Sequence, residues 1–354
     1  MKNRDCYKKI EVIMRDRSIL LKEIDNCITS GVQEGVFPGA NYCLVIDDVE
    51  YYGSFGNKAT TPVVEPNRLD TVYDIASLTK VVGTTTAILK LVEAGQLKLE
   101  DKVSQYLPYI DNDIVTIRHL MTHSSGYPAL TTGTEVMTSV EPLLRDLRSC
   151  TLEYEPDSKV VYSDVGFMYL GFIIEKLTGS LPLYLEKHFF EPLKMQDTCF
   201  NHKEIDRIAP TEIFGFRGLI RGSVHDEKSF LLKGVAGHAG LYSTVKDLSL
   251  FAKMILNRGE LNGERFLTEE AIELIQRKVI QADDAYRSIG WIIRQVSDHE
   301  VIYHTGYTGT SLLIDFEKQL AFILLSNRVH PTRANIQIIG FRKRLEAILY
   351  ENCH

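Results

Sequence analysis

The fold is decided by residues 71–80, which read Thr-Val-Tyr-Asp-Ile-Ala-Ser-Leu-Thr-Lys. The first half of this stretch is β-prone and leads directly into Ser77. The apolar residues after Ser77 predict a long helix from about Leu78 to Ala94, and Gly95 follows where a left-handed helix cap is expected. On such a helix Ser77 and Lys80 lie three residues apart and share one face, so the lysine amine can reach the serine hydroxyl.

This Ser-x-x-Lys arrangement suits nucleophilic catalysis. A serine hydroxyl is a poor nucleophile and needs an adjacent base, and a lysine is a base only if its surroundings lower its pKa. Ser77 at the start of a helix also has backbone N–H groups that can bind an oxyanion. The tetrapeptide alone is more often a serine N-cap than a catalytic pair, and its position between strand and helix is what favours catalysis.

A second group of candidates is Tyr162 with Asp164, just before an apolar helix. A tyrosine can act as a general acid or base when an ammonium lies nearby. Asp164 could orient Lys80 or accept a substrate amide N–H. The alternative is a plain helix start, with Ser163 or Asp164 as the N-cap and Tyr162 as core filling.

A third group, His304-Thr305-Gly306, ends a predicted strand and leads into Tyr307. A polar side chain, a hydroxyl and a glycine at a strand edge can line a cleft, and the glycine lets substrate backbone come close. The alternative is an ordinary glycine-containing hairpin turn.

The apolar patterns predict strands at both ends of the chain and helices between them. The fold class is therefore α+β, with an antiparallel sheet flanked by helices and a mostly helical inserted subdomain. We expect residues 18–97 and 235–354 to form one α/β subdomain and residues 98–234 the insertion. The expected elements are a helix at 18–34, a hairpin of 41–47 and 50–55 turning at Asp47-Asp48, strands at 290–296, 301–304, 311–315 and 320–326, and a closing helix at 333–350.

Composition narrows the function further. The 354 residues carry 40 basic and 47 acidic side chains, and a net charge of -7 without a basic block does not favour nucleic acid as a partner. The charged first 20 residues resemble no signal peptide, and no run is long and apolar enough for a transmembrane segment. A cytoplasmic protein is therefore expected, unless an export signal has been trimmed.

We predict neither a cofactor nor a metal. His119 and His123 have helical spacing but lack the glutamate of a zinc-protease motif. The glycines of residues 234–240 do not match a nucleotide-binding loop, and we interpret that segment as a flexible loop over the cleft. No pair of the six cysteines has CxxC spacing, so free, mostly buried thiols are expected; these are Cys6, Cys27, Cys43, Cys150, Cys199 and Cys353.

The three groups lie in a characteristic order, with 85 residues from Ser77 to Tyr162 and 142 from Tyr162 to His304. This order resembles the class C β-lactamase and DD-peptidase superfamily, whose motifs are Ser-x-x-Lys, Tyr-x-Asn and Lys-Thr-Gly or His-Thr-Gly. Residues 120–126 and 237–248 are similar to two further segments of that superfamily. Residues 224–227, 234–240 and 304–310 resemble its penicillin-binding-protein-4B-like branch. The resemblance extends from about residue 30 to 345 and implies a β-lactamase/transpeptidase-like fold.

The resemblance also implies roles. Ser77 would be the nucleophile, Lys80 its partner and Tyr162 the acid/base for the leaving group, with the backbone N–H groups of Ser77 and Tyr307 as the oxyanion hole. Whether Lys80 or Tyr162 deprotonates the serine stays open. Asp164 stands where Asn is usual, and His304 replaces the Lys of typical β-lactamases: a carboxylate cannot donate as an amide does, and a histidine is mostly neutral at pH 7.

These departures favour a hydrolase of D-amino-acid peptides, or of small esters or amides, working through an acyl-Ser77 intermediate. One alternative is a true β-lactamase, and another is a non-hydrolytic penicillin sensor or scaffold. If His304 is protonated between pH 5 and 8, activity on carboxylate substrates should depend on pH. The partner expected is a small-molecule or peptide substrate, and the sequence indicates no oligomeric state.

Overall fold

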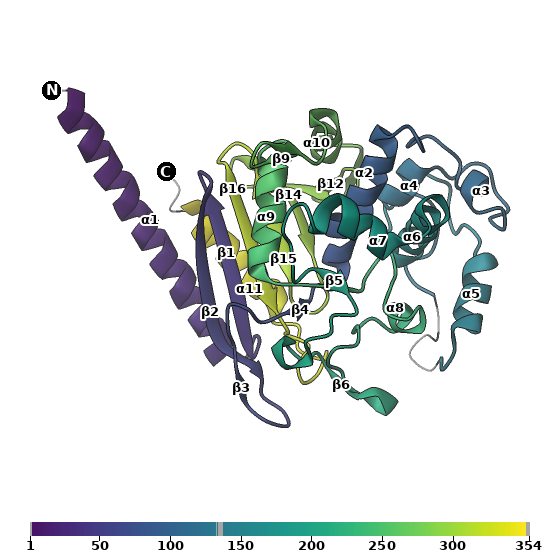
Figure 1. Cartoon of the computed structure of the whole chain (residues 1–354), viewed down its shortest axis with the longest axis horizontal. Coiled ribbons are helices and arrows are strands. Elements are labelled where there is room, and N and C mark those ends of the chain that lie inside the picture. Colours follow the sequence, from purple (N-terminus) through teal and green to yellow (C-terminus); the bar gives the residue numbers. More distant parts are fainter. Residues whose placement is uncertain (1, 132, 134–136, 352–354) are drawn as a thin grey trace.

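The computed structural model describes residues 2–131, 133 and 137–351, with side chains described from residue 17 onward. Its centre is a nine-stranded antiparallel sheet (Figure 1), in the order β11-β12-β13-β14-β15-β16-β1-β2-β3. The N-terminal strand β1 (Gly39–Ile46) pairs along its whole length with β16 (Leu320–Ser326) from the other end of the chain. The sheet therefore unites both ends of the sequence, as the α+β prediction requires.

The hairpin of β1 and β2 (Val49–Ala59) forms as predicted. Asp47 and Asp48 form its turn with φ values of +49° and +64°, the left-handed conformation that a two-residue hairpin turn needs. Alternate residues of β1 enter two different cores. Cys43 and Val45 pack on one face of the sheet, and Tyr42 and Leu44 pack on the other. Burial on both faces explains why this strand is nearly all apolar.

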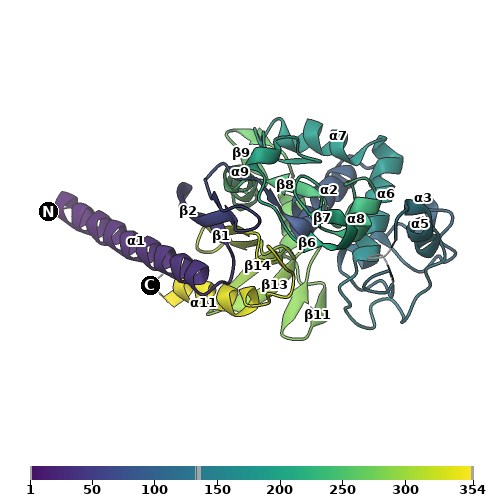
Figure 2. The same ribbon diagram turned by 90° about the horizontal axis from the view of Figure 1, so that it is seen from below.

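One face of the sheet is covered by α1 (Lys2–Gln33) and α11 (Ile338–Glu351), which lie side by side (Figure 2). Figure 1 shows the first turns of α1 reaching well past the edge of the sheet. The helix predicted at 18–34 thus begins much earlier. The closing helix begins later than the predicted residue 333, because the Asn335 side chain accepts a hydrogen bond from the Gln337 N–H and holds a turn before α11.

The other face carries α9 (Val245–Leu256) and the helical region, which includes the segment that begins at Ser77. The helix predicted from Leu78 to Ala94 is divided into a 3₁₀ turn, η1 (Ala76–Leu78), a π-turn, η2 (Lys80–Thr85), and α2 (Thr86–Glu93). Gly95 follows with φ +65°, as predicted. π-turns insert a residue into a helix and often occur at functional sites.

The remaining elements complete the two layers. Helices and helical turns are α3 (Val103–Tyr106), α4 (Ile117–Met121), α5 (Val140–Arg148), α6 (Asp164–Thr178), α7 (Leu181–Leu185), η4 (Glu186–Phe190), η5 (Ile205–Arg207), η6 (Gly215–Arg217), α8 (Glu227–Leu231) and α10 (Glu269–Gln276). Strands are β3 (Glu65–Pro66), β4 (Tyr73–Asp74), β5 (Cys199–Phe200), β6 (Ile213–Phe214), β7 (Gly218–Leu219), β8 (Leu241–Ser243), β9 (Glu260–Leu261), β10 (Glu264–Arg265), β11 (Ile280–Ala282), β12 (Ala285–Arg287), β13 (Ile292–Val296), β14 (His299–Thr305) and β15 (Ser311–Asp315).

The described residues between the two parts of the sheet include α3 to α8, and the strands among them are two or three residues long. The exact division at residues 98 and 234 stays a prediction. None of the helices in the described part of the chain is long and apolar enough to cross a membrane. Cys27, Cys43, Cys150 and Cys199 are free, but only Cys43 is fully buried; the side chains of Cys6 and Cys353 lie outside the described residues.

Candidate active site

Ser77 lies in a short turn that the backbone holds under strain. Ala76, just before it, has φ +48°, a conformation that costs a residue with a Cβ of order 1–3 kcal/mol. Two hydrogen bonds fix the turn, from the Ala76 N–H to Asp74 Oδ1 (2.8 Å) and from the Leu78 N–H to the Ile75 carbonyl (3.0 Å). The half-buried Ser77 side chain lines a cavity of about 460 Å³.

Lys80 is fully buried beside Ser77 and uses all three donors of its ammonium. Its Nζ lies 3.0 Å from Ser77 Oγ, 2.8 Å from Asp164 Oδ1 and 3.0 Å from the His238 carbonyl oxygen. The predicted contact between serine and lysine is therefore present. Burial opposes the charge, but the Asp164 carboxylate and Tyr162 outweigh it and raise the pKa of Lys80 above its ordinary value. Lys80 is thus an ammonium in the resting site.

Tyr162 lines the same cavity as Ser77 and is half-buried. The centre of its ring lies 4.8 Å from Lys80 Nζ, and the ring packs on His123 with 4.4 Å between ring centres. His123 also accepts a hydrogen bond at Nδ1 from the Ser163 N–H (3.0 Å). His123, which the sequence suggested only as an improbable metal ligand, therefore fixes both the ring and the backbone of the Tyr162 segment.

Asp164 is the first residue of α6, and the N-cap is Ser163, whose Oγ accepts from the Gly166 N–H. The Asp164 side chain lies behind Lys80, is almost fully buried and does not line the cavity. Burial raises its pKa, but Lys80, His238 and Lys228 lower it more, and the carboxyl stays ionised. The predicted pairing with Lys80 is confirmed, whereas the predicted contact of Asp164 with substrate is not supported.

His304 is the last but one residue of β14, and its ring is buried at the cavity wall. Its Nδ1 lies 3.0 Å from the Thr305 carbonyl, and because a carbonyl can only accept, Nδ1 carries the proton and Nε2 is left as an acceptor. Burial, with Lys80 and Arg287 nearby, holds the pKa of His304 well below its ordinary value. The expectation that His304 becomes charged between pH 5 and 8 is therefore wrong.

Gly306 and Tyr307 lie against the segment that carries Ser77. A Cβ on Gly306 would come within 2.1 Å of Thr310 Oγ1 and 2.5 Å of the Ile75 carbonyl oxygen. Thr308 Oγ1 donates to the Asp74 carbonyl (2.8 Å) and Thr310 Oγ1 donates to the Ile75 carbonyl (3.0 Å). The glycine is thus required by the protein's own packing, and Tyr307 is held at the cavity next to Thr305.

The cavity contains residues that the motifs did not predict. Arg287, at the end of β12, has no carboxylate partner among the described residues, and its NH1 is buried without a hydrogen bond. Its guanidinium lies 5.6 Å from the centre of the Tyr162 ring. In register, Arg287 pairs with Ile292, which pairs with Tyr303, the neighbour of His304. Arg287 could have been predicted as a site residue from the sequence, because it is a basic residue on a strand two places from the His304 strand in a sheet of consecutive antiparallel strands.

The glycine-rich segment 234–240 is mostly buried and is not a lid over the cleft. Its Gly237 carbonyl accepts from Thr84 Oγ1 (2.6 Å), and the next carbonyl, of His238, accepts from Lys80. A Cβ on Gly237 would come within 2.1 Å of the Phe167 carbonyl oxygen and 2.8 Å of the Gly171 nitrogen. The interpretation as a flexible loop is therefore wrong, because the glycines allow this segment to pack tightly under Lys80.

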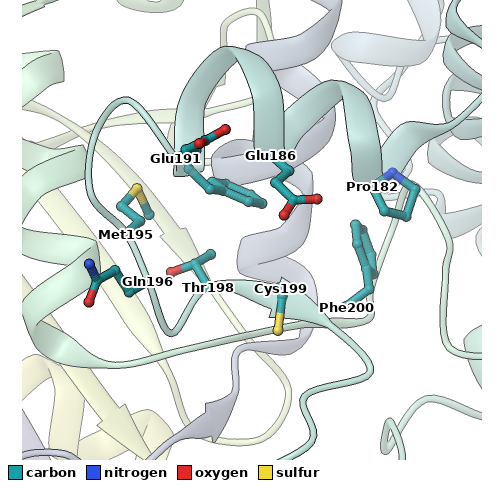
Figure 3. A pocket seen from close by; sticks show the side chains of 9 residues that line it. Pro182, Glu186, Glu191, Met195, Gln196, Thr198, Cys199 and Phe200 are labelled. Atoms are coloured by element: carbon teal, nitrogen blue, oxygen red, sulfur yellow. The ribbon is translucent and has the colours of Figure 1, made fainter.

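A second cavity, of about 420 Å³, lies between η4 and β5 (Figure 3). Figure 3 shows the Glu186 carboxylate and the Phe200 ring directed into it. None of its lining residues belongs to the three motif groups or lines the Ser77 cavity. The chemistry predicted from the sequence therefore belongs to the cavity at Ser77.

The chain belongs to the β-lactamase family, because the family model named Beta-lactamase matches residues 24–342. The family is one of serine hydrolases, which agrees with the Ser77 and Lys80 geometry. Among curated proteins, the chain is 30% identical to one from Escherichia coli O157:H7 over 90% of this chain and 84% of that protein, and to one from Salmonella paratyphi A over 90% and 85%. Both carry the name "Putative D-alanyl-D-alanine carboxypeptidase".

Solved structures share the fold. The octameric penicillin-binding protein homologue from Pyrococcus abyssi is 25% identical, with a TM-score of 0.74 over 92% of this chain and 77% of that chain. EstCE1, described as a hydrolase with promiscuous acyltransferase activity, is 19% identical with a TM-score of 0.79 over 95% of this chain and 100% of that chain. A class C β-lactamase is 17% identical with a TM-score of 0.78, over 96% and 98% of the two chains.

Proposed function

We propose that the protein is a D-amino-acid carboxypeptidase, which removes the last residue of a D-alanyl-D-alanine-type peptide through an acyl-Ser77 intermediate. The observation that carries this proposal is the position of Arg287, a guanidinium without a carboxylate partner in the same cavity as Ser77. A peptide that ends in a free carboxylate supplies the missing anion. The names of the curated relatives support the same substrate class.

In the proposed mechanism, Ser77 Oγ attacks the carbonyl carbon of the last peptide bond and its proton passes to Tyr162. Lys80 is held as an ammonium by three acceptors and has no lone pair to take the proton, which favours Tyr162, whose ring centre lies 4.8 Å from Lys80 Nζ, as the proton acceptor. The N–H groups of Ser77 and Tyr307 would bind the oxyanion. Tyr162 then returns the proton to the departing amine, and water hydrolyses the acyl-enzyme.

The wall of the cavity agrees with a peptide substrate whose C-terminus is anionic. His304 is neutral and presents Nε2 as an acceptor, so it does not supply the fixed positive charge that a lysine would. Arg287 supplies it instead, from two strands away. A guanidinium binds a carboxylate through two parallel hydrogen bonds, which also orients the substrate.

The test is release of the terminal amino acid from diacetyl-L-Lys-D-Ala-D-Ala, measured by chromatography. The matched substrate ends in L-Ala, and the matched variant is Ser77→Ala. We expect D-alanine release by the wild type, little from the L-Ala peptide and none from Ser77→Ala. Equal release by the wild type and Ser77→Ala, or no release by either, would refute the proposal.

A second candidate is hydrolysis of small esters or amides with an apolar acyl group. It is favoured by four isoleucines that line the same cavity, namely Ile292, Ile336, Ile338 and Ile339. A p-nitrophenyl ester series of increasing chain length tests it: a rise in kcat/KM from acetate to hexanoate, lost in Ser77→Ala, would support an esterase. An efficient β-lactamase is less favoured, because Asp164 faces Lys80 and Lys228 rather than the cavity and, as a carboxylate, has no N–H to donate.

A further inference from the structure

A chain of charged side chains continues from Lys80 into the interior. Asp164 contacts Lys80 through Oδ1, at 2.8 Å, and faces Lys228 through Oδ2, at 3.4 Å. The Lys228 ammonium also lies 3.0 Å from Asp226 Oδ2, and the other oxygen of Asp226 lies 2.7 Å from His238 Nε2. The two carboxylates thus share one ammonium, and Lys228 is only 5% exposed.

The short distance between the two carboxylates makes Lys228 necessary. Carboxylate oxygens of Asp164 and Asp226 lie within 4.8 Å of each other and of a His238 ring nitrogen. Two carboxylates this close repel each other, and in a site with little water one of them takes up a proton unless a cation lies between them. Three such ligands resemble a metal site, but here the Lys228 ammonium lies between the two acids and, together with Lys80, balances their charges.

We propose that Lys228 is a positioning residue for catalysis, which keeps Asp164 ionised beside Asp226 so that Asp164 can hold the Lys80 ammonium against Ser77. The inference rests on the proposed function of Ser77 and adds a requirement to it. An asparagine at position 164 would need no such cation, because it has no charge to balance. In this chain Asp164, with Lys228 beside it, thus occupies the position of the amide in the Tyr-x-Asn motif.

The groups that face Asp164 come from every element packed around it. Lys80 on η2, Lys228 on α8 and His238 before β8 favour its charge, and Asp226 at the start of α8 opposes it. Across the cavity wall, His304 on β14 also feels the Asp164 charge. The pKa of Lys228 is raised, since Asp226 and Asp164 outweigh its burial. Lys228 is therefore positively charged near neutral pH.

The first experiment does not depend on activity. In protein labelled with ¹³C at the aspartate carboxyl groups, NMR follows the titration of Asp164 and Asp226 in the wild type and in Lys228→Met, which replaces the four-carbon stem of the lysine with an apolar chain of four atoms and removes the ammonium. We expect one of the two carboxyls to titrate about 1–3 pH units higher in Lys228→Met. The double variant Lys228→Met/Asp226→Asn should reverse this shift, because one carboxylate alone beside Lys80 has no neighbour to repel it.

The second readout is the rate at which a fluorescent penicillin labels Ser77, measured from pH 5 to 8. In Lys228→Met the acid side of this profile should move to higher pH, and Asp226→Asn on that background should move it back. Lys90→Met is the control, because Lys90 pairs with Glu93 outside the cavity; its profile should equal that of the wild type. Loss of packing at residue 228 would lower the rate at every pH and would not be rescued by Asp226→Asn.

The two experiments decide whether Lys228 keeps Asp164 ionised. Unchanged carboxyl titration in Lys228→Met, or a shift that Asp226→Asn does not reverse, overturns the inference. If Lys228→Met does not fold, recovery of a folded protein in the double variant supports the repulsion argument, and failure to recover contradicts it. A wild type that is never labelled at Ser77 would refute the proposed function while the NMR titration still decides the role of Lys228.

Discussion

Replacing Arg287 with methionine should remove the recognition of the substrate carboxylate while leaving the reacting groups in place. The guanidinium is largely buried and meets no carboxylate among the described residues. A hydrogen bond between two charged groups contributes about 1.5–3 kcal/mol. At about 1.4 kcal/mol for each factor of ten, kcat/KM for a carboxylate-ended peptide should fall about 10- to 150-fold.

The assay compares two substrates and two enzymes. The wild type and Arg287→Met each hydrolyse diacetyl-L-Lys-D-Ala-D-Ala and its C-terminal amide. In the wild type, kcat/KM for the amide should be lower than kcat/KM for the free peptide by the same factor. In Arg287→Met the two substrates should have equal kcat/KM, because each change removes the same contact. Arg344→Met, which breaks a surface pair with Glu34, serves as the control and should leave both rates unchanged.

Two results would contradict this reasoning. One is an equal loss on both substrates, which would mean that Arg287 acts on the reacting groups rather than on the carboxylate. The other is a large loss of stability in Arg287→Met. An unpaired buried charge costs free energy, so its removal should leave the folded state as stable as before or more stable.

Further predictions concern other parts of the site. Tyr162→Phe should lower kcat about 10²- to 10⁴-fold with KM nearly unchanged, and equal kcat values would exclude Tyr162 as the proton carrier. Gly237→Ala should lower the free energy of unfolding by about 1–3 kcal/mol, because its Cβ would meet the Phe167 carbonyl oxygen at 2.1 Å, whereas Gly340→Ala, with open space around it, should not. The pKa values of His123 and His304 are lowered well below 6.5, so as pH falls below about 6.5 these histidines bind protons in the unfolded chain but not in the folded one. The free energy of unfolding, measured in urea, should therefore fall by up to about 1.4 kcal/mol per pH unit for each histidine. Equal urea midpoints at pH 7 and pH 5 would contradict this.

The sequence predicted the groups that lie near one another along the chain better than those brought together by the fold. The i, i+3 spacing of Ser77 and Lys80 gives their contact on any helical turn, and the structure has it at 3.0 Å. The helix type was not predictable, because the π-turn depends on packing from distant segments, including the hydrogen bond from Thr84 to the Gly237 carbonyl.

Charge states were harder to predict than positions. Asp164 was expected beside Lys80, but its second oxygen faces Lys228, 64 residues further along the chain. His304 looks like a group that titrates near neutral pH, yet its burial and two nearby cations lower its pKa. Glycine-rich residues 234–240 resemble a mobile loop in sequence, and only the closeness of Gly171 and Phe167 shows why residue 237 must be a glycine. Burial decides all three cases, and a single sequence does not show it.

Acylation of Ser77 can be measured directly. The protein is incubated with a fluorescent penicillin at pH 7, digested, and the labelled peptide is sequenced by mass spectrometry, with Ser77→Ala and Ser163→Ala treated alongside. We expect one label, on Ser77, which is absent from Ser77→Ala and retained in any folded Ser163→Ala protein. A label on another residue, or equal labelling of Ser77→Ala, would contradict it.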